Sequence, residues 1–398
     1  SMETINKLHD LAKHMALEPA EEVAAAGLGR VAPCGLVVEE KTPQKRKKNE
    51  ELGVFHAAMP GGKTIPLLKT LLTSACERNC HYCPFRAGRN YRRTTFSPDE
   101  MAKTFTDMHR AGLVEGLFLS SGIIGGGVKT QDKITDTAEI LRRKYRFRGY
   151  IHLKVMPGAE KGQVERAMQL ANRLSVNLEA PNGARLHSLA PLKQFEQELL
   201  RPLRWIEQIR HAQSEREGWN GRWPSSTTQF VVGGGQETDL ELLTTAEFLY
   251  RHLNLQRTYF SAFNPIPDTP LENLPAEDPL RQHRLYQASF LFRDYGFDLE
   301  DLPFAADGNL PRAKDPKLAW AEQHLLHCPV EVNRAEPEQL LRVPGIGPKS
   351  ARNIIQERRK GTLKALAELR EIGVRTKNLE PYVLLDGKRP HRQLRLFP

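Results

Sequence analysis

Three cysteines within one short segment are the feature that most limits what this chain can fold into. Cys76, Cys80 and Cys83 have a C-x3-C-x2-C spacing, which brings three thiolates within reach of one iron–sulfur cluster. A [4Fe–4S] cluster normally takes four thiolates, so three leave one iron for a distant ligand or a small molecule. Zinc is the alternative, but the only further local ligand, His81, stands between two of the cysteines, where it is poorly placed to complete a tetrahedron.

The use of cysteine favours a reducing compartment. Three close cysteines cannot all pair with one another, and Cys34 and Cys328 lie in unrelated segments. The chain has no secretory apolar segment and no apolar run of about 18 residues, the length that a membrane span needs. We therefore expect a cytoplasmic protein without disulfides and with no membrane partner.

Short apolar or β-branched runs alternate with helix-length segments along the body of the chain. Strands separated by such segments imply a parallel sheet. The first predicted strand ends immediately before Cys76, which places the cysteines at the carboxyl end of a strand, where parallel β/α barrels have their chemistry. The six predicted strands are Ile65–Thr73, Gly116–Ser121, Tyr150–Val155, Leu174–Leu178, Thr228–Val232 and Thr258–Phe263.

The cysteine spacing, with Tyr82 directly before Cys83, resembles the signature of the radical S-adenosylmethionine (SAM) superfamily. This resemblance implies an α/β fold, a partial (β/α)6 barrel, with a [4Fe–4S] cluster on Cys76, Cys80 and Cys83. It also implies that SAM binds the open iron and is cleaved to a 5′-deoxyadenosyl radical, which abstracts hydrogen from carbon. The cofactor then does the difficult chemistry, and the protein positions the reactants.

The same resemblance assigns candidate contacts to SAM at the ends of the predicted strands. Ser175, Asn177 and Glu179 alternate with apolar residues, so they share one face of the fourth strand. For Asn177 and Glu179, a plain structural hydrogen-bonding role is the alternative. The candidate cofactor-binding residues are Tyr82, Ser120, Ser121, Gly122, Asn177, Glu179, Gly233 and Glu237.

No catalytic residue is identified by the sequence, but three side chains are candidates. His152 and Lys154 share one face of the third predicted strand and are candidates for substrate contact. Cys328 is a candidate hydrogen-atom donor to a product radical, with an ordinary free cysteine as the alternative.

A second motif lies near the C-terminus, in the segment Pro344–Lys349 (PGIGPK). Apolar residues at helical spacing precede and follow it, which predicts a helix, a tight turn and a second helix. Asn333 is the expected N-cap of the first helix, with Glu336 three residues later. The alternative is that the glycines merely close a helical turn.

This segment resembles the helix-hairpin-helix (HhH) motif, whose G-x-G turn presents backbone N–H groups to a DNA phosphate without reading sequence. The resemblance makes Gly345, Gly347, Lys349, Arg352 and Arg358 the candidate DNA-binding residues.

The distribution of charge agrees with a polyanionic partner. The formal net charge is +10, and the last 68 residues hold 15 Lys and Arg against 8 Asp and Glu. A basic terminal region on a more balanced body is typical of nucleic-acid binding. The basic run Lys41–Lys48 is either a solvated loop or an auxiliary nucleic-acid arm.

The blocks Glu115–Gly122, Gly149–Lys154 and Pro279–Ala288 resemble a bacterial group of radical SAM proteins assigned to DNA modification or repair. The resemblance implies an enzyme that modifies or repairs a nucleotide in DNA, with a glycosylase-like protein as a possible partner and flavodoxin or ferredoxin as electron donor. An RNA-modifying enzyme, a non-catalytic iron–sulfur DNA-binding protein and a protein-binding HhH are the alternatives. The expected domains are an N-terminal extension with a basic loop (1–60), the barrel (61–300), a linker (301–330) and a small all-α HhH domain (331–398).

Overall fold

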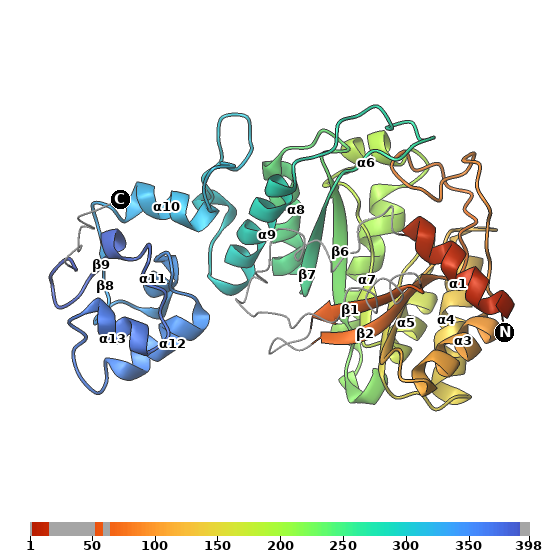
Figure 1. The fold of residues 1–398 in the computed structure, drawn as a ribbon, viewed down its shortest axis with the longest axis horizontal. Coiled ribbons are helices and arrows are strands. Elements are labelled where there is room, and N and C mark those ends of the chain that lie inside the picture. Colours follow the sequence, from red (N-terminus) through yellow and green to blue (C-terminus); the bar gives the residue numbers. More distant parts are fainter. Residues whose placement is uncertain (1, 16–51, 59–63, 391–398) are drawn as a thin grey trace. The chain divides into compact units, whose positions relative to one another are not determined.

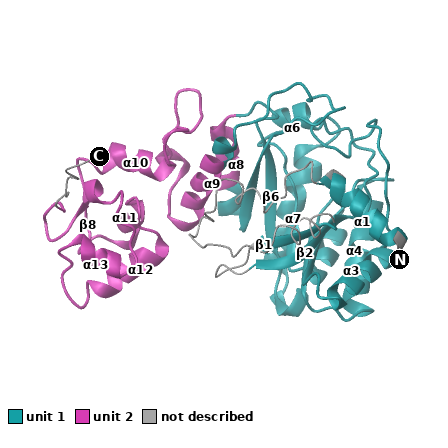
Figure 2. Cartoon of the chain, viewed as in Figure 1, with its two compact units in different colours: residues 1–237, 248–282 teal, residues 238–247, 283–398 magenta. Residues whose placement is uncertain are grey.

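Seven strands form one sheet in the larger of two compact units (Figures 1 and 2). The computed structural model describes residues 2–15, 52–58 and 64–390. The larger unit takes residues 1–237 and 248–282, and the smaller takes 238–247 and 283–398. The domain limits expected from the sequence stay a prediction, and the basic run Lys41–Lys48 lies outside the described residues.

The sheet keeps the order of the sequence, from β1 to β7. β1 is antiparallel to β2, and all later neighbours are parallel, so each crossover carries a helix or a longer connection. The strands are β1 (Val54–Ala58), β2 (Thr64–Leu71), β3 (Gly116–Ser120), β4 (Tyr150–Lys154), β5 (Arg173–Ser175), β6 (Ser225–Val232) and β7 (Arg257–Ala262). Together they form a curled half-barrel, which confirms the predicted parallel α/β architecture.

Helices fill the connections between the strands. The first of them after the cysteines, α3, begins at a capping box in which Ser97 and Glu100 satisfy each other's backbone N–H groups. The helices of the larger unit are α1 (Met2–Met15), α3 (Pro98–Arg110), α4 (Gly127–Arg143), α5 (Lys161–Leu170), α6 (Gly183–Leu189) and α7 (Arg201–Ala212). α8 (Asp239–His252) and α9 (Pro279–Asp294) are divided between the units, with the greater part of each in the smaller one. Within the described ranges, no helix has the length and apolar character that a membrane crossing requires.

The parallel strands have one apolar face and one polar face, because successive side chains alternate between the faces. Leu117, Leu119, Ile151 and Leu153 share the apolar face and are completely buried. In a β/α barrel the helices cover this outer face, and the opposite face lines the lumen. The register places the following polar residues on the lumen face: Lys69, Ser120, His152, Lys154, Arg173, Ser175, Thr227, Gln229, Arg257 and Tyr259.

The strand predictions differ from the structure mainly at their ends. All six predicted strands are present, whereas the antiparallel β1 was not predicted. The fourth predicted strand, Leu174–Leu178, is paired only over Arg173–Ser175, after which the chain makes an isolated bridge between Glu179 and Phe230. Between them the N–H of Leu178 donates to the Thr228 hydroxyl and not to a β6 carbonyl, which interrupts the regular pairing, and Glu179 itself has a positive φ of 64°.

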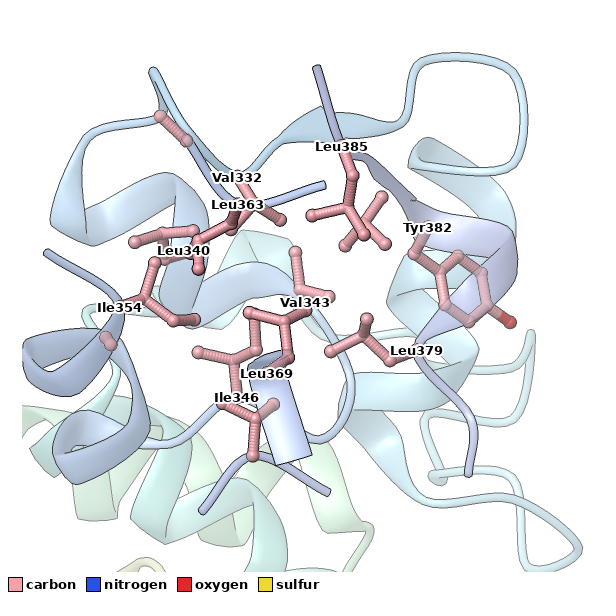
Figure 3. Close-up of a cluster of buried hydrophobic side chains, with 14 of the residues drawn as sticks. Val332, Leu340, Val343, Ile346, Ile354, Leu363, Leu369, Leu379, Tyr382 and Leu385 are labelled. Atoms are coloured by element: carbon pink, nitrogen blue, oxygen red, sulfur yellow. The ribbon is translucent and has the colours of Figure 1, made fainter. Parts of the chain in front are cut away.

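The smaller unit has its own apolar core, formed by short helices (Figure 3). Leu340, Val343, Ile346 and Ile354 come from the helical hairpin and meet Leu369 in this core. The elements here are α10 (Pro316–His324), α11 (Pro337–Arg342), α12 (Pro348–Glu357) and α13 (Leu366–Glu371), with a parallel pair of two-residue strands, β8 (Val330–Glu331) and β9 (Val383–Leu384).

The predicted start of the first hairpin helix was wrong. The N-cap of α11 is Glu336, whose capping partner is Gln339, and Asn333 stands outside the helix. Asn333 instead donates to the carbonyl of Leu363 and accepts from the N–H of the same residue, so it ties two segments of the small unit together. Pro337 fixes the first helical position, and this favours the later start.

Candidate functional site

The three cysteines lie on the loop that follows β2, at the carboxyl end of the sheet. Cys80 is buried and Cys76 and Cys83 are half-buried, and none of the three forms a disulfide with a described cysteine. Backbone N–H groups of Ile123 and Phe85 point at the sulfurs of Cys76 and Cys83, each at 3.4 Å. Such N–H···S contacts stabilise thiolate ligands, so this loop fits a thiolate-bound cluster.

The three thiols do not have to converge on one point in order to hold a cluster. In the part of the chain that the structure describes, no three His, Cys, Asp or Glu side chains converge on one metal-ion position. Cluster thiolates bind different irons, so they need no common point. Burial raises the pKa of the Cys80 thiol, but a coordinating metal deprotonates a thiol outright.

Arg93 holds the cysteine loop in shape. Its guanidinium donates to the backbone carbonyls of Ser74, Phe85, Arg86 and Arg89, at 2.9, 2.7, 2.8 and 3.1 Å. These acceptors lie before and after the cysteines, so one planar fork joins both flanks of the loop. Sequence reasoning missed Arg93, because nothing local distinguishes it from the neighbouring arginines.

The segment after β3 lies directly against the cysteine loop. The N–H of Gly122 donates to the carbonyl of Thr73 at 2.7 Å, and a Cβ at Gly122 would stand 2.2 Å from the carbonyl oxygen of Ala75. Only glycine allows this approach. Ser120 ends β3, and the buried Ser121 donates its hydroxyl to the carbonyl of Gly122.

Glu77, inside the cysteine motif, joins the loop to the start of α4. Its carboxylate accepts from the N–H groups of Gly125 and Gly126, at 3.0 and 3.1 Å. These N–H groups precede the helix, where a negative charge is favourable. Glu77 was not predicted as a site residue.

A buried ion pair stands beside the cysteines. Lys193 and Glu179 are 3.0 Å apart, with side chains only 9% and 7% exposed. Although burial opposes it, the pKa of Lys193 is raised by Cys80, Glu179 and Cys83, and the pKa of Glu179 is lowered chiefly by Lys193 and further by a hydrogen bond from Tyr82. Both groups are therefore charged at neutral pH, and the charge of the ammonium acts together with Cys80 and Cys83 of the motif.

The predicted cofactor residues Tyr82 and Asn177 thus join a polar network at one end of the lumen. Tyr82 is buried and reaches Glu179 through its side chain. Asn177 is also buried, and its amide donates to Gln229 at 3.4 Å. Lys193 completes the network and was missed, because it follows α6 with no local motif around it.

The predicted pair Gly233 and Glu237 forms a closed turn after β6. The Glu237 carboxylate accepts from the N–H groups of Gly233 and Gly235, at 2.5 and 3.1 Å. Burial raises the pKa of Glu237, against these hydrogen bonds and the charge of Arg281. A Cβ at Gly233 would stand 2.4 Å from the carboxylate of Glu277. The turn is therefore rigid, and its contact with adenine stays a prediction.

His152 and Lys154 share the lumen face of β4, as their alternation predicted, whereas Cys328 belongs to the smaller unit and is exposed. His152 is 1% exposed and its ring is stacked on Phe118, with the centroids 4.1 Å apart. Burial, helped by Arg173, Lys154 and Lys69, holds the pKa of His152 well below its ordinary value, so its imidazole is neutral.

The helical turn of the smaller unit exposes the start of α12. Gly347 is its N-cap and supplies no side-chain cap, so the first N–H groups of the helix lack that partner. Lys349 and Arg352, on the first turns, are exposed. Gly345 has a φ of +88°, and a Cβ there would stand 2.4 Å from the carbonyl oxygen of Arg375, so this glycine is needed for packing as well.

The buried Lys317 supports the turn, and no sequence motif predicted this role. Its ammonium donates to the carbonyl of Ile346 at 2.6 Å and stands 4.5 Å from the ring centre of Tyr295. Burial lowers the pKa of Lys317 to about 7, although Asp315 acts in the opposite direction.

Arg358 lies apart from the other predicted DNA-binding residues, at the C-cap of α12. Its guanidinium donates to the carbonyls of Val332 and Ala335, at 3.0 and 2.7 Å. Arg358 therefore satisfies two backbone carbonyls within the smaller unit, and its contact with DNA stays a prediction.

Comparison with known proteins finds two family models. Residues 70–249 match the radical SAM superfamily, and residues 327–380 match the helix-hairpin-helix motif. Among curated proteins, no match is found.

Solved structures similar to the chain include methylornithine synthase, PylB (14% identity, 57% of this chain and 62% of that chain, TM-score 0.44). A second is the [FeFe]-hydrogenase maturase HydG from Carboxydothermus hydrogenoformans (14% identity, 57% of this chain and 51% of that chain, TM-score 0.44). A third is the radical SAM methyltransferase TsrM from Kitasatospora setae (13% identity, 52% of this chain and 38% of that chain, TM-score 0.37). The match thus spans less than two thirds of each of these proteins.

Proposed function

Since the chain carries a radical SAM domain followed by a helix-hairpin-helix motif, we propose that it is a radical SAM enzyme that modifies or repairs a nucleotide in DNA. The observation that carries this proposal is the presence of both sites in one chain. A loop with three free cysteines stands at the carboxyl end of a half-barrel, and an uncapped helix start with exposed basic residues stands in the smaller unit.

Cys76, Cys80 and Cys83 would hold a [4Fe–4S] cluster, and the cysteine loop fits that group because backbone N–H groups point at two of the sulfurs. When bound, the cluster and SAM supply a carbon-centred radical that abstracts hydrogen from the substrate. The three-cysteine set also speaks against a non-catalytic DNA-binding cluster, which would use four.

The residues around the cysteine loop would bind and orient the cofactor. Lys193 supplies a fixed positive charge beside Cys80 and Cys83, which offsets the negative charge of thiolates. Gly122 lets the backbone after β3 approach the loop. The other proposed contacts to SAM, on the geometry described above, are Tyr82, Ser120, Ser121, Asn177, Glu179, Gly233 and Glu237.

The smaller unit would hold nucleic acid through phosphate. The N–H groups at the start of α12, which no N-cap side chain satisfies, and the adjacent Lys349 and Arg352 form the type of site that binds an oxyanion without reading sequence. Binding by several such charges is expected to fall steeply with salt. A base in duplex DNA must leave the stack to reach a barrel lumen, at a cost of a few kcal/mol.

Two partners belong to the proposal. A radical SAM enzyme needs a one-electron donor, for which flavodoxin or ferredoxin is suitable, and a glycosylase-like protein is a possible partner from the sequence resemblance. An RNA substrate is the second candidate function, since the HhH contact to phosphate does not itself distinguish deoxyribose from ribose.

The test is SAM cleavage under anaerobic conditions. The purified chain is reconstituted with iron and sulfide, then reduced, and 5′-deoxyadenosine is quantified with duplex DNA, single-stranded DNA, damaged DNA or structured RNA. We expect DNA to stimulate cleavage, Cys80→Ala to abolish it and Cys328→Ala, at an exposed cysteine of the other unit, to leave it unchanged.

Two outcomes would contradict the proposal. Stimulation by RNA alone would replace DNA with RNA as the substrate. An intact cluster with no cleavage under any condition would point to the non-catalytic alternative. In parallel, salt-matched binding to duplex DNA should weaken in Lys349→Gln/Arg352→Gln but not in Lys364→Gln, an exposed position of the same unit.

A further inference from the structure

The lumen of the half-barrel contains buried polar groups that the proposed contacts to SAM do not use. Ser175 and Thr227 are completely buried and His152 is 1% exposed. The Ser175 hydroxyl, the Thr227 hydroxyl and both ring nitrogens of His152 have no hydrogen-bond partner among the described residues. A buried polar group without a partner costs stability, so a set of four such atoms calls for an explanation.

The register of the sheet brings these groups together. Lys154 of β4 pairs with Ser175 of β5, and Ser175 pairs with Thr227 of β6. His152 pairs with Arg173, two residues earlier on each of β4 and β5, so this pair lies on the same face as Lys154 and Ser175. We call these five residues, His152, Lys154, Arg173, Ser175 and Thr227, the lumen cluster.

The charges that act on His152 are positive. Arg173, Lys154 and Lys69 all act on His152, and each disfavours its protonation. A neutral imidazole with two unused nitrogens provides one donor and one acceptor, and the two hydroxyls add donors. Cations together with several hydrogen-bond donors match a compact oxyanion.

The lumen cluster also has a definite position relative to the cysteine loop. Glu179 lies four residues after Ser175 in the chain, beyond the end of β5, and its carboxylate interacts electrostatically with both Lys193 and Lys154. Lys193 in turn faces Cys80 and Cys83. The lumen cluster therefore lies deeper in the lumen than Glu179, because Ser175 and its strand partners precede the bend at Glu179.

From this geometry we propose that the lumen cluster is a phosphate subsite, which binds the phosphate group of the nucleotide on which the enzyme acts. The inference rests on the proposed function for the word nucleotide, whereas the oxyanion chemistry follows from the cluster itself. Its depth requires the phosphate to enter the lumen, so the source is either a strand end carrying a 5′-phosphate or a free mononucleotide.

The test uses two variants that remove donors without breaking any contact. Ser175→Ala and Thr227→Val replace hydroxyls that have no hydrogen-bond partner in the described ranges, so the double variant should fold with an unchanged or higher melting temperature. The matched control is Thr70→Val, a buried threonine of β2 on the opposite face of the sheet.

Binding to the full-length protein is measured by calorimetry with four probes: a deoxynucleoside, its 5′-monophosphate, inorganic phosphate and a short single strand with or without a 5′-phosphate. We expect the monophosphate to bind more tightly than the nucleoside. The double variant should lose that advantage, on the order of ten-fold, while keeping the affinity for the nucleoside.

Equal binding of the monophosphate by the wild type and by the folded double variant would overturn the subsite. So would equal affinity of the wild type for nucleoside and monophosphate. Tight binding of the mononucleotide but not of the phosphorylated strand would keep the subsite and identify a free nucleotide as the source. This outcome would contradict the DNA substrate, so the two proposals fail separately.

Discussion

Replacing Lys317 with methionine should flatten the pH dependence of the stability of the smaller unit. The lysine is buried beneath the turn, with its ammonium on the Ile346 carbonyl. Its pKa falls from 10.5 to about 7 on folding because burial disfavours the charged form. Between these two values the unfolded chain binds a proton that the folded chain does not, so stability rises with pH across that window. The unfolding free energy therefore decreases as the pH falls below 10.5, and the decrease ends just below pH 7, where Lys317 is protonated in both states.

The magnitude follows from the two pKa values. Lowering the pH from about 9.5 to about 6.5 should cost the wild type about 3 kcal/mol of unfolding free energy through this one group. Lys317→Met has no titrating group at this position, so its unfolding free energy should not show this decrease. At high pH the variant should be the less stable protein by about 1–3 kcal/mol, because the Ile346 carbonyl loses its donor.

The assay is urea denaturation of the full chain at both pH values, with digestion of the unfolded fraction by a short pulse of protease and detection of peptides from residues 316–390. The difference between wild type and variant cancels the other titrating groups. Lys314→Met is the control, because this lysine is half-exposed and paired with Glu322 at the surface. A wild type and a Lys317→Met variant with parallel pH profiles would refute the reasoning.

Three further results are expected. Lys193→Met should destabilise the larger unit by about 3–5 kcal/mol, because it leaves Glu179 buried without its counter-charge. Glu179→Gln should destabilise it less, because the thiols of Cys80 and Cys83 still act on the Lys193 ammonium. Thermal unfolding of the two variants shows which is the less stable. Gly345→Ala should destabilise the smaller unit by about 1–3 kcal/mol, because alanine is strained at the positive φ of this position. Circular dichroism should therefore accompany any DNA-binding measurement on this variant, to show whether the unit is still folded. Gly361→Ala is the control, because a Cβ there meets open space. Gly122→Ala should lower the iron content after reconstitution, because its Cβ would push the cysteine loop away; full iron loading would count against that packing.

The parts of the site that could be predicted are those written in contiguous residues. The cysteine spacing, the alternation around Asn177 and the PGIGPK turn each carry their chemistry within a few positions, so a local pattern suffices. The residues that were missed act on distant parts of the chain. Lys193 acts electrostatically on Cys80 from a distant part of the chain, and Lys317 of α10 donates to the carbonyl of Ile346 in the turn. Neither contact has a signature in sequence spacing.

Some predicted residues have a different first task in the structure. Glu237 satisfies the N–H groups of its own turn, and Arg358 satisfies two carbonyls of the small unit. A motif indicates which residue type stands at a position, but not whether its hydrogen-bonding capacity is already used by the fold. Asn333 shows the same limit, since a residue favoured at helix starts joins two loops instead.

The support of the cysteine loop by Arg93 and Glu77 has a consequence for the life of the protein in air. Neither residue is a candidate cluster ligand, yet together they fasten both flanks and the middle of the loop. The entropy of ordering the loop is therefore lost during folding and not during metal assembly. If this loop holds the proposed cluster, a cluster destroyed by oxygen could be rebuilt on the folded chain from iron and sulfide, so oxidative damage would be a reversible loss of cofactor, with no need to replace the protein.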